Sequence, residues 1–164
     1  MNKILYFGGQ KSGKSRLAEQ KALTLSVNKP YYIATYDNSF GDSEMKDRIN
    51  KHIQKRGENF ITIESPYNLP DVIKPNNTYL IDCLSMWLLN NIDKSEDDLI
   101  EELKELQKID ANIVFVLNDV TNGVIPIDKV SRKYVDLSGI IGQVTASFCD
   151  EVYEVKLGIG VRLK

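Results

Sequence analysis

The sequence predicts one α/β domain over residues 1–164, built on a mostly parallel β-sheet that is flanked by helices. Short apolar runs of strand length alternate with longer segments of helical periodicity, and this alternation favours a parallel sheet with helical crossovers. A Gly-rich loop separates the first apolar run from the first helical segment. A chain of 164 residues buries about two thirds of its unfolded surface, which is enough for one core.

The predicted strands are short runs rich in Ile, Val, Tyr and Phe, the residue types that favour extended backbone. The run at 113–117 is apolar throughout, which is typical of a central parallel strand covered on both faces. The predicted strands cover residues 4–7, 31–34, 60–63, 79–81, 113–117 and 152–157.

The predicted helices lie between these strands. Residues 43–56 place apolar side chains at four-residue steps, so that one apolar stripe faces inward. Ser95 can cap the helix that follows it, and two aspartates in the first turn suit the positive end of the helix dipole. The predicted helices cover residues 15–27, 43–56, 84–89, 95–109 and 128–149, the last with a possible break at Gly139 or Gly142. The longest predicted loops cover 36–42, 65–77 and 118–127.

Charge and hydropathy exclude several classes of function. The chain has 21 Lys and Arg against 23 Asp and Glu, a formal net charge of −2. This balance argues against a nucleic-acid strand or an anionic membrane as the partner. No apolar run approaches the roughly 18 residues of a membrane span, and the run at 4–7 is too short for a signal peptide. We therefore expect a cytoplasmic protein.

The histidine and cysteine counts narrow the possible chemistry further. His52 is the single histidine, which excludes metal sites that need two histidines from one chain. Cys83 and Cys149 form no C-x-x-C pair, so no zinc cluster is predicted. We expect both to be buried structural thiols in a reducing compartment. Trp87 lies in an apolar helix, so we place it in the core or at a subunit interface.

A phosphate-binding loop is the strongest motif in the chain. Its pattern, G-x-x-x-x-G-K-[ST], is matched in full and lies between a predicted strand and a predicted helix, which makes a chance match rare. Gly residues let several backbone N–H groups turn toward one anion, and the helix N-terminus adds partial positive charge. Lys14 is predicted to reach the β- and γ-phosphates, and Ser15 to ligate Mg²⁺. The loop consists of Gly8, Gly9, Gln10, Lys11, Ser12, Gly13, Lys14 and Ser15.

An acidic residue on the magnesium side of the site is expected after a later strand. Asp82 ends the apolar run at 78–82, and its carboxylate could hold the metal directly or through water. The alternative is that Asp82 caps the helix that follows it. Asp119 and Glu64 also follow predicted strands and are further candidates, which the sequence alone does not rank. Of the two, Glu64 is included among the predicted nucleotide-binding residues.

A basic segment contains the only histidine of the chain. Arg48, Lys51 and Arg56 crowd the predicted helix at 43–56 around His52, and cations there could bind a polyphosphate. A neutral imidazole is also a competent nucleophile near pH 7. Attack on the α-phosphorus of a nucleotide would release pyrophosphate and leave a phosphoramidate. The alternative is a solvated basic helix with an incidental histidine.

Several motifs together make the chain resemble a known enzyme family. The most specific is R-I-x-x-H-x-x-x-R at 48–56, and the loop at 8–15, L-I-D-C-L at 80–84 and D-L-S-G at 136–139 keep the family's order. Over nearly its whole length the chain is similar to the bifunctional adenosylcobinamide kinase/adenosylcobinamide-phosphate guanylyltransferases of cobalamin biosynthesis.

The resemblance implies a P-loop NTPase fold of the recombinase-ATPase type with an antiparallel carboxyl-terminal edge, formed by strands over 151–157 and 161–163. It also implies two reactions: phosphorylation of the aminopropanol hydroxyl of adenosylcobinamide by ATP or GTP, then transfer of GMP from GTP to that phosphate. In such enzymes the histidine of the R-I-x-x-H element carries the GMP, and here that position is His52. Mg²⁺ is the implied cofactor, and a homo-oligomer, a trimer in the family, is the implied assembly.

The chain departs from the family pattern at four positions. Asp119 stands where the family has Glu, Val135 and Ile140 stand where it has Arg, and Gly142 stands where it has Asn. Each replaced side chain could serve phosphate or substrate binding, so the departures leave open whether both activities are retained. Two alternatives therefore stand beside the bifunctional enzyme. They are a P-loop small-molecule kinase without guanylyltransferase activity and a nucleotide-binding regulatory module.

Overall fold

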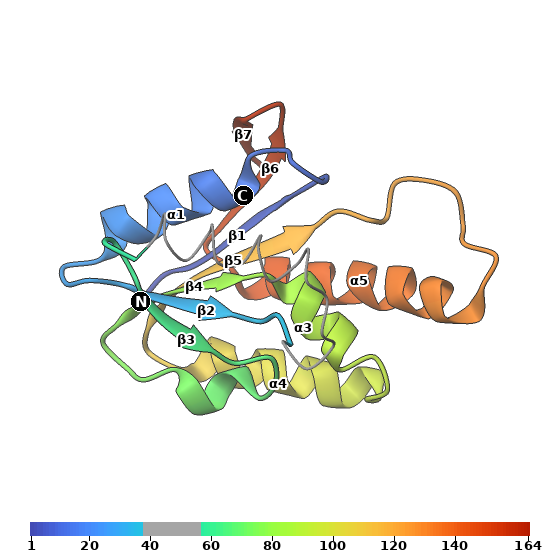
Figure 1. Cartoon of the computed structure of the whole chain (residues 1–164), viewed down its shortest axis with the longest axis horizontal. Coiled ribbons are helices and arrows are strands. Elements are labelled where there is room, and N and C mark those ends of the chain that lie inside the picture. Colours follow the sequence, from blue (N-terminus) through green and yellow to red (C-terminus); the bar gives the residue numbers. More distant parts are fainter. Residues whose placement is uncertain (38–56) are drawn as a thin grey trace.

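A seven-stranded sheet runs through the computed structural model, which describes residues 1–37 and 57–164 (Figure 1). The strand order is β3-β2-β4-β5-β1-β6-β7, and all neighbours are parallel except β6 and β7. This confirms the predicted α/β fold with an antiparallel carboxyl-terminal edge. The strands are β1 (Lys3–Gly8), β2 (Tyr31–Ala34), β3 (Ile61–Glu64), β4 (Thr78–Asp82), β5 (Asn112–Asn118), β6 (Glu151–Lys156) and β7 (Ile159–Arg162).

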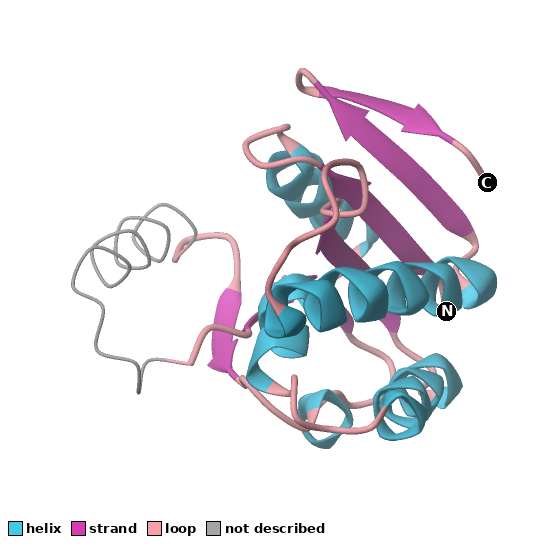
Figure 2. Ribbon diagram, turned by 90° about the vertical axis from the view of Figure 1, so that its right-hand side faces the viewer, coloured by secondary structure: helices cyan, strands magenta, loops and turns pink. Residues whose placement is uncertain are grey.

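Helices cover both faces of the sheet (Figures 1 and 2). One face is covered by α1 (Lys14–Leu25), and the other by α3 (Leu84–Asn90), α4 (Glu96–Lys108) and α5 (Lys129–Phe148). A short 3₁₀ helix, η2 (Leu69–Val72), lies within the segment predicted as a loop.

The predicted break in the last helix is wrong, because α5 runs without interruption through Gly139 and Gly142. Two glycines cost a helix about 1 kcal/mol each relative to alanine. Burial of Leu137 and Ile141 against the sheet offsets that cost.

The structure also places Glu64 inside β3 as its last residue, where the prediction ended the strand one residue earlier. The predicted helix at 43–56 lies outside the described residues.

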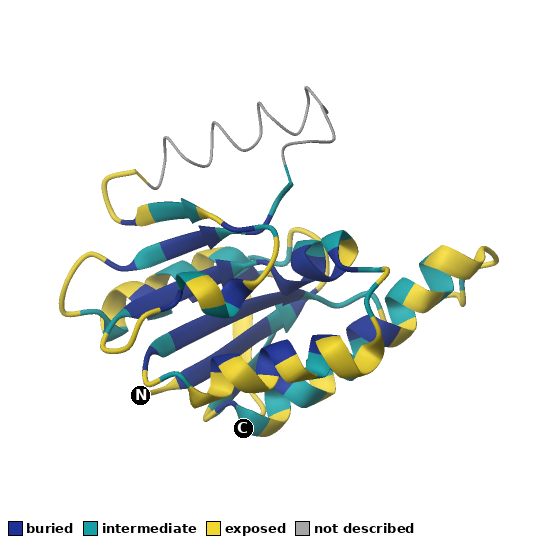
Figure 3. Cartoon of the chain, turned by 90° about the horizontal axis from the view of Figure 1, so that it is seen from below, coloured by how far each residue is buried: buried dark blue, intermediate teal, exposed yellow. Residues whose placement is uncertain are grey.

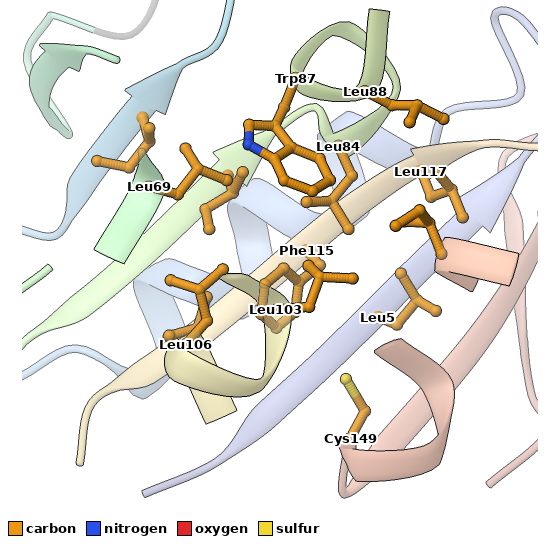
Figure 4. Packing of buried hydrophobic residues seen from close by; sticks show 14 of the residues in the cluster. Leu5, Leu69, Leu84, Trp87, Leu88, Leu103, Leu106, Phe115, Leu117 and Cys149 are labelled. Atoms are coloured by element: carbon orange, nitrogen blue, oxygen red, sulfur yellow. The ribbon is translucent and has the colours of Figure 1, made fainter. Parts of the chain in front are cut away.

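Two hydrophobic cores lie on opposite faces of the sheet. Successive strand side chains point to opposite faces, so Ile4 packs with the α1 side and Leu5 with the side of α3, α4 and α5. Figure 4 shows the larger core, in which Phe115 and Trp87 lie among leucines of the helices and of the sheet. Because both faces are covered, the central strands are buried along most of their length (Figure 3).

The residues expected in the core are found there. Trp87 has 0% of its surface exposed, and its Nε1 donates a hydrogen bond to Glu102 Oε1 at 3.0 Å. Cys83 and Cys149 are free, buried thiols. Burial raises the pKa of Cys83 to about 11 and that of Cys149 to about 12, so both stay protonated at neutral pH. None of the helices within the described residues is long and apolar enough to cross a membrane.

Candidate nucleotide-binding site

The phosphate-binding loop connects the carboxyl end of β1 to the start of α1, as its sequence predicted (Figure 1). Gly13 is the N-cap of α1 and has a φ of 95°, and Lys11 also has a left-handed φ, of 56°. Within the loop, the Ser12 N–H donates to the Gly9 carbonyl at 3.2 Å. The first N–H groups of α1 have no helical acceptor and carry the positive end of its dipole. The loop therefore offers an anion site of the predicted kind.

The side chain of Lys14 lies across this loop. Its Nζ donates to the Gly9 carbonyl at 3.1 Å, and only 7% of the residue is exposed. Burial lowers the pKa of Lys14, while the nearby Cys83 and Asp82 raise it by a smaller amount. Within the described residues this buried ammonium has one carbonyl as its hydrogen-bond acceptor. A phosphate oxygen would add a second acceptor and replace part of the solvation lost on burial.

The loop brings Ser15 next to Asp82, the last residue of β4. Ser15 Oγ donates to Asp82 Oδ1 at 3.4 Å, and the Tyr32 hydroxyl donates to Asp82 Oδ2 at 3.1 Å. The N-cap of α3 is Cys83, without a side-chain cap bond in the described chain, so the geometry does not favour the alternative in which Asp82 caps α3. A serine hydroxyl beside a carboxylate is a pair of hard oxygen ligands, which fits Mg²⁺.

Thr35 supports this site, and the sequence analysis did not predict that role. Its Oγ1 accepts a hydrogen bond from the Cys83 N–H at 3.0 Å and donates to the Cys83 carbonyl at 2.8 Å. The Thr35 carbonyl accepts from Asn90 Nδ2 at 2.7 Å. These bonds fix the backbone that follows Asp82, where the Asp82–Cys83 peptide bond is cis. No local pattern signals them, because they join the end of β2 to the start of α3.

Within the described residues, the side chains of the other two acidic candidates form no hydrogen bond with Ser15. Glu64 is an exposed residue at the end of β3, and it pairs in register with Ala34, as Asp82 does on the other side of β2. The carboxylate of Asp119 is bound within its own loop, because it accepts hydrogen bonds from the Thr121 N–H, Thr121 Oγ1 and Asn122 Nδ2. Of the three carboxylates, Asp82 is the one that contacts the phosphate-binding loop through its side chain.

The hydrogen bonds also set the charge of Asp119. Burial alone would raise the pKa of this carboxyl, but the bonds from Thr121 and Asn122 lower it below its ordinary value. Asp119 is therefore ionised at neutral pH. Its backbone N–H donates to the Gly8 carbonyl at 2.9 Å, which ties this loop to the first glycine of the phosphate-binding motif.

The predicted basic cluster cannot be placed beside this geometry. Arg48, Lys51, His52 and Arg56 all lie outside the described residues, and their roles stay predictions. The described part of the site therefore consists of the loop at 8–15, Asp82 and the residues that support them.

Comparison with known proteins assigns the chain to a family. The family model described as cobinamide kinase / cobinamide phosphate guanyltransferase matches residues 4–163. The chain belongs to this family. It is 36% identical to the bifunctional adenosylcobalamin biosynthesis protein CobP of Pseudomonas aeruginosa, over 98% of this chain and 96% of the relative. It is 33% identical to the bifunctional adenosylcobalamin biosynthesis protein CobU of Escherichia coli, over 98% of this chain and 99% of the relative.

Two of the four positions at which we expect this chain to depart from the family pattern line one cavity. This cavity has a volume of about 320 Å³ and lies between the sheet and α5, with Leu5, Phe7 and Leu117 in its walls. Asp119 and Gly142 are also in its lining, and a Cβ at position 142 would come within 3.2 Å of Leu117 Cδ2. The absence of a side chain at Gly142 therefore contributes to the space beside Leu117.

Proposed function

We propose that this chain phosphorylates the aminopropanol hydroxyl of adenosylcobinamide and then transfers GMP from GTP to the phosphate it has made. The products of the second reaction are adenosylcobinamide-GDP and pyrophosphate. The observation that carries the proposal is the Ser15–Asp82 pair at 3.4 Å beside a complete phosphate-binding loop, in a chain of the cobinamide kinase family.

The kinase step uses the described part of the site. The acceptor hydroxyl oxygen forms a bond to the γ-phosphorus of ATP or GTP, the bond to the β–γ bridging oxygen breaks, and the hydroxyl proton is released. Residues 8–15 bind the phosphates through backbone N–H groups, and Lys14 neutralises charge on the β- and γ-phosphates. Ser15 and Asp82 are the proposed ligands of Mg²⁺. When bound, Mg²⁺ would stabilise negative charge on the phosphate oxygens.

The guanylyltransferase step is assigned to His52. A ring nitrogen attacks the α-phosphorus of GTP and forms a P–N bond, and the bond to the leaving pyrophosphate breaks. A phosphate oxygen of adenosylcobinamide phosphate then attacks the same phosphorus, breaks the P–N bond and regenerates the imidazole. Arg48, Lys51 and Arg56 are proposed to stabilise charge on the α-phosphate, and Glu64 to contact the nucleotide.

The proposal extends to the organisation and location of the protein. Residues 1–164 are proposed to form one domain, and copies of the chain to form a homo-oligomer, a trimer as in the family resemblance. A cytoplasmic location is supported by two free thiols that the fold keeps buried.

The test uses GTP labelled at the α- or the γ-phosphate. With α-labelled GTP we expect the protein to acquire an acid-labile, base-stable label, and His52→Ala to abolish that label while nucleotide binding remains. With γ-labelled GTP and adenosylcobinamide, we expect label on the acceptor. A label that persists in His52→Ala would show that the nucleophile is another residue.

The same experiment separates the two alternatives. Transfer of γ-label without any α-label on the protein or on adenosylcobinamide phosphate indicates a kinase without guanylyltransferase activity. Nucleotide binding without transfer of either label, in the presence of both acceptors, indicates a regulatory module.

A further inference from the structure

The turn between β6 and β7 contacts the phosphate-binding loop, although the two lie at opposite ends of the chain. This turn consists of Leu157 and Gly158, which both have left-handed backbone, with φ of 52° and 79°. The Gly158 N–H donates a hydrogen bond to the Ser12 carbonyl at 2.7 Å. The β6–β7 hairpin lies beside the loop and α1 in Figure 1.

Both glycines that the G-x-x-x-x-G-K-[ST] motif specifies, Gly8 and Gly13, fit against the backbone of this hairpin. A Cβ added at Gly8 would lie 2.3 Å from the Val155 carbonyl oxygen, and one added at Gly13 would lie 3.0 Å from the Gly158 Cα. Any side chain at either position would push the loop and the hairpin apart. Glycine is therefore needed here for the hairpin's close approach, in addition to any need of a bound phosphate.

Two side chains of α1 fasten this helix to the hairpin. Arg16 Nη2 donates to the Gly158 carbonyl at 3.3 Å, next to the loop. Lys21 Nζ pairs with Glu151 Oε2 at 2.8 Å, at the far end of β6. The Arg16–Gly158 hydrogen bond thus lies at the turn, and the Lys21–Glu151 ion pair lies remote from it. The remote ion pair supplies a matched control.

We infer that the β6–β7 turn positions the phosphate-binding loop for its nucleotide, with Gly158 as the positioning residue that acts through Ser12. In a trans peptide the carbonyl and the following N–H point in opposite directions. Because the Ser12 carbonyl is held against the turn, the Gly13 N–H of the same peptide points away from it. The hydrogen bond from Gly158 thus fixes the orientation of one N–H donor in the loop.

This inference rests on the proposed function only in that the loop binds a nucleotide. It needs neither the corrinoid acceptor nor His52. Nucleotide binding to the wild-type chain therefore tests the proposed function of the loop, and the variants of Gly158 test the positioning role separately.

The experiment measures the Kd of a fluorescent ATP analogue with Mg²⁺ for a series of variants at Gly158. Among the described residues, a Cβ at this position meets only Arg16 Nη2, at 3.7 Å. The substitutions are therefore limited by the positive φ of Gly158 and not by a steric clash. Asparagine adopts a left-handed φ with little strain. The conformational strain is larger for alanine and largest for a β-branched residue. We expect Gly158→Asn to stay within about twofold of wild type, Gly158→Ala to raise Kd about fivefold, and Gly158→Val to raise it tenfold or more.

Lys21→Gln is the control for a general loosening of the hairpin. We expect it to lower Tm while leaving Kd unchanged, because its tie to Glu151 is remote from the loop. Kd values that stay at the wild-type level across the Gly158 series would overturn the inference. So would an increase in Kd for Lys21→Gln that matches Gly158→Ala. If Gly158→Val does not fold, the comparison of Gly158→Asn with Gly158→Ala decides.

Discussion

Glu102 is the residue on which two buried donors depend. Its Oε1 accepts hydrogen bonds from the Leu69 N–H at 2.9 Å and from Trp87 Nε1 at 3.0 Å. Its Oε2 pairs with Lys94 Nζ at 3.2 Å. One carboxylate thus joins η2, α3 and α4 under the larger core. Asp82 is a similar shared acceptor in the candidate site, because its carboxylate accepts hydrogen bonds from both Ser15 and Tyr32.

Removal of the Glu102 carboxylate should destabilise the fold strongly. Glu102→Ala leaves the Leu69 N–H and the Trp87 Nε1–H buried without an acceptor, at a cost of about 1–3 kcal/mol for each group. We expect the free energy of unfolding, measured in urea, to fall by about 2–5 kcal/mol. Glu101→Ala, at an exposed position of the same helix, should change it by less than about 0.5 kcal/mol. Equal effects of the two variants would contradict the proposed dependence.

Substitution of Asp82 should act on the metal requirement. Asp82→Asn keeps the shape of the side chain but removes its charge beside Ser15, and we expect the Mg²⁺ concentration for half-maximal kinase activity to rise about 10- to 100-fold. Asp119→Asn is the matched control, because that carboxylate is bound to Thr121 and Asn122 within its own loop. A similar rise in both variants would argue against Asp82 as the acid on the metal side.

At the scale of elements, helix α5 shows how packing overrides a local preference. Two glycines lie in its interior, yet the helix spans Lys129–Phe148 without a break. Leu137 and Ile141 are almost fully buried against the sheet, and Asp128 caps the helix by accepting from the Ser131 N–H at 2.8 Å. Most helical stability in proteins comes from such packing of an apolar face.

Gly139→Ala should therefore stabilise the protein. A Cβ at position 139 would meet Thr121 Cγ2 at 3.6 Å, an ordinary van der Waals contact. We expect a gain of about 1 kcal/mol in the free energy of unfolding, measured by guanidinium denaturation. Gly13→Ala gives the contrast, because Gly13 has a φ of 95° and a Cβ there would come within 3.0 Å of Gly158 Cα. A loss of stability in Gly139→Ala would show that this face of α5 has no room for a methyl group.

At the scale of the whole molecule, the fold buries the thiols of both cysteines. Cys83 follows Asp82, and Cys149 lies between α5 and β6 in the larger core (Figure 4). Burial raises the pKa values of these thiols to about 11 and about 12. The charged thiolate is the reactive form, so the fold keeps both groups inert.

The thiols should therefore report on global unfolding. We expect neither to react with a disulfide reagent at pH 8 in the native protein, and both to react in guanidinium. Because the folded pKa values lie above the ordinary value of 9.0, the thiols' contribution to stability is complete below about pH 9 and is lost as the pH rises toward 12. The double variant Cys83→Ala, Cys149→Ala should lose less stability over this range than wild type. Rapid labelling of the native protein would contradict burial of the thiols.

Strand and helix positions could be predicted because they depend on local periodicity. The run at 113–117 and the cap at Ser95 each carry their signal within a few residues, and both are found as expected. The short η2 escaped prediction because its Pro-containing segment has no helical stripe. The predicted break in α5 was wrong because local propensity takes no account of burial against the sheet.

The candidate site likewise has one part that the sequence predicted and another that depends on the tertiary structure. The phosphate-binding loop is one contiguous motif, so the chain alone determined its residues and its place between a strand and a helix. Only the tertiary structure decided that Asp82, and not Asp119, contacts Ser15. It also decided that Thr35 holds the backbone at Cys83 and that Gly158 holds the carbonyl of Ser12. These contacts join residues far apart in the chain, and they exist only because the order of strands in the sheet brings those residues together.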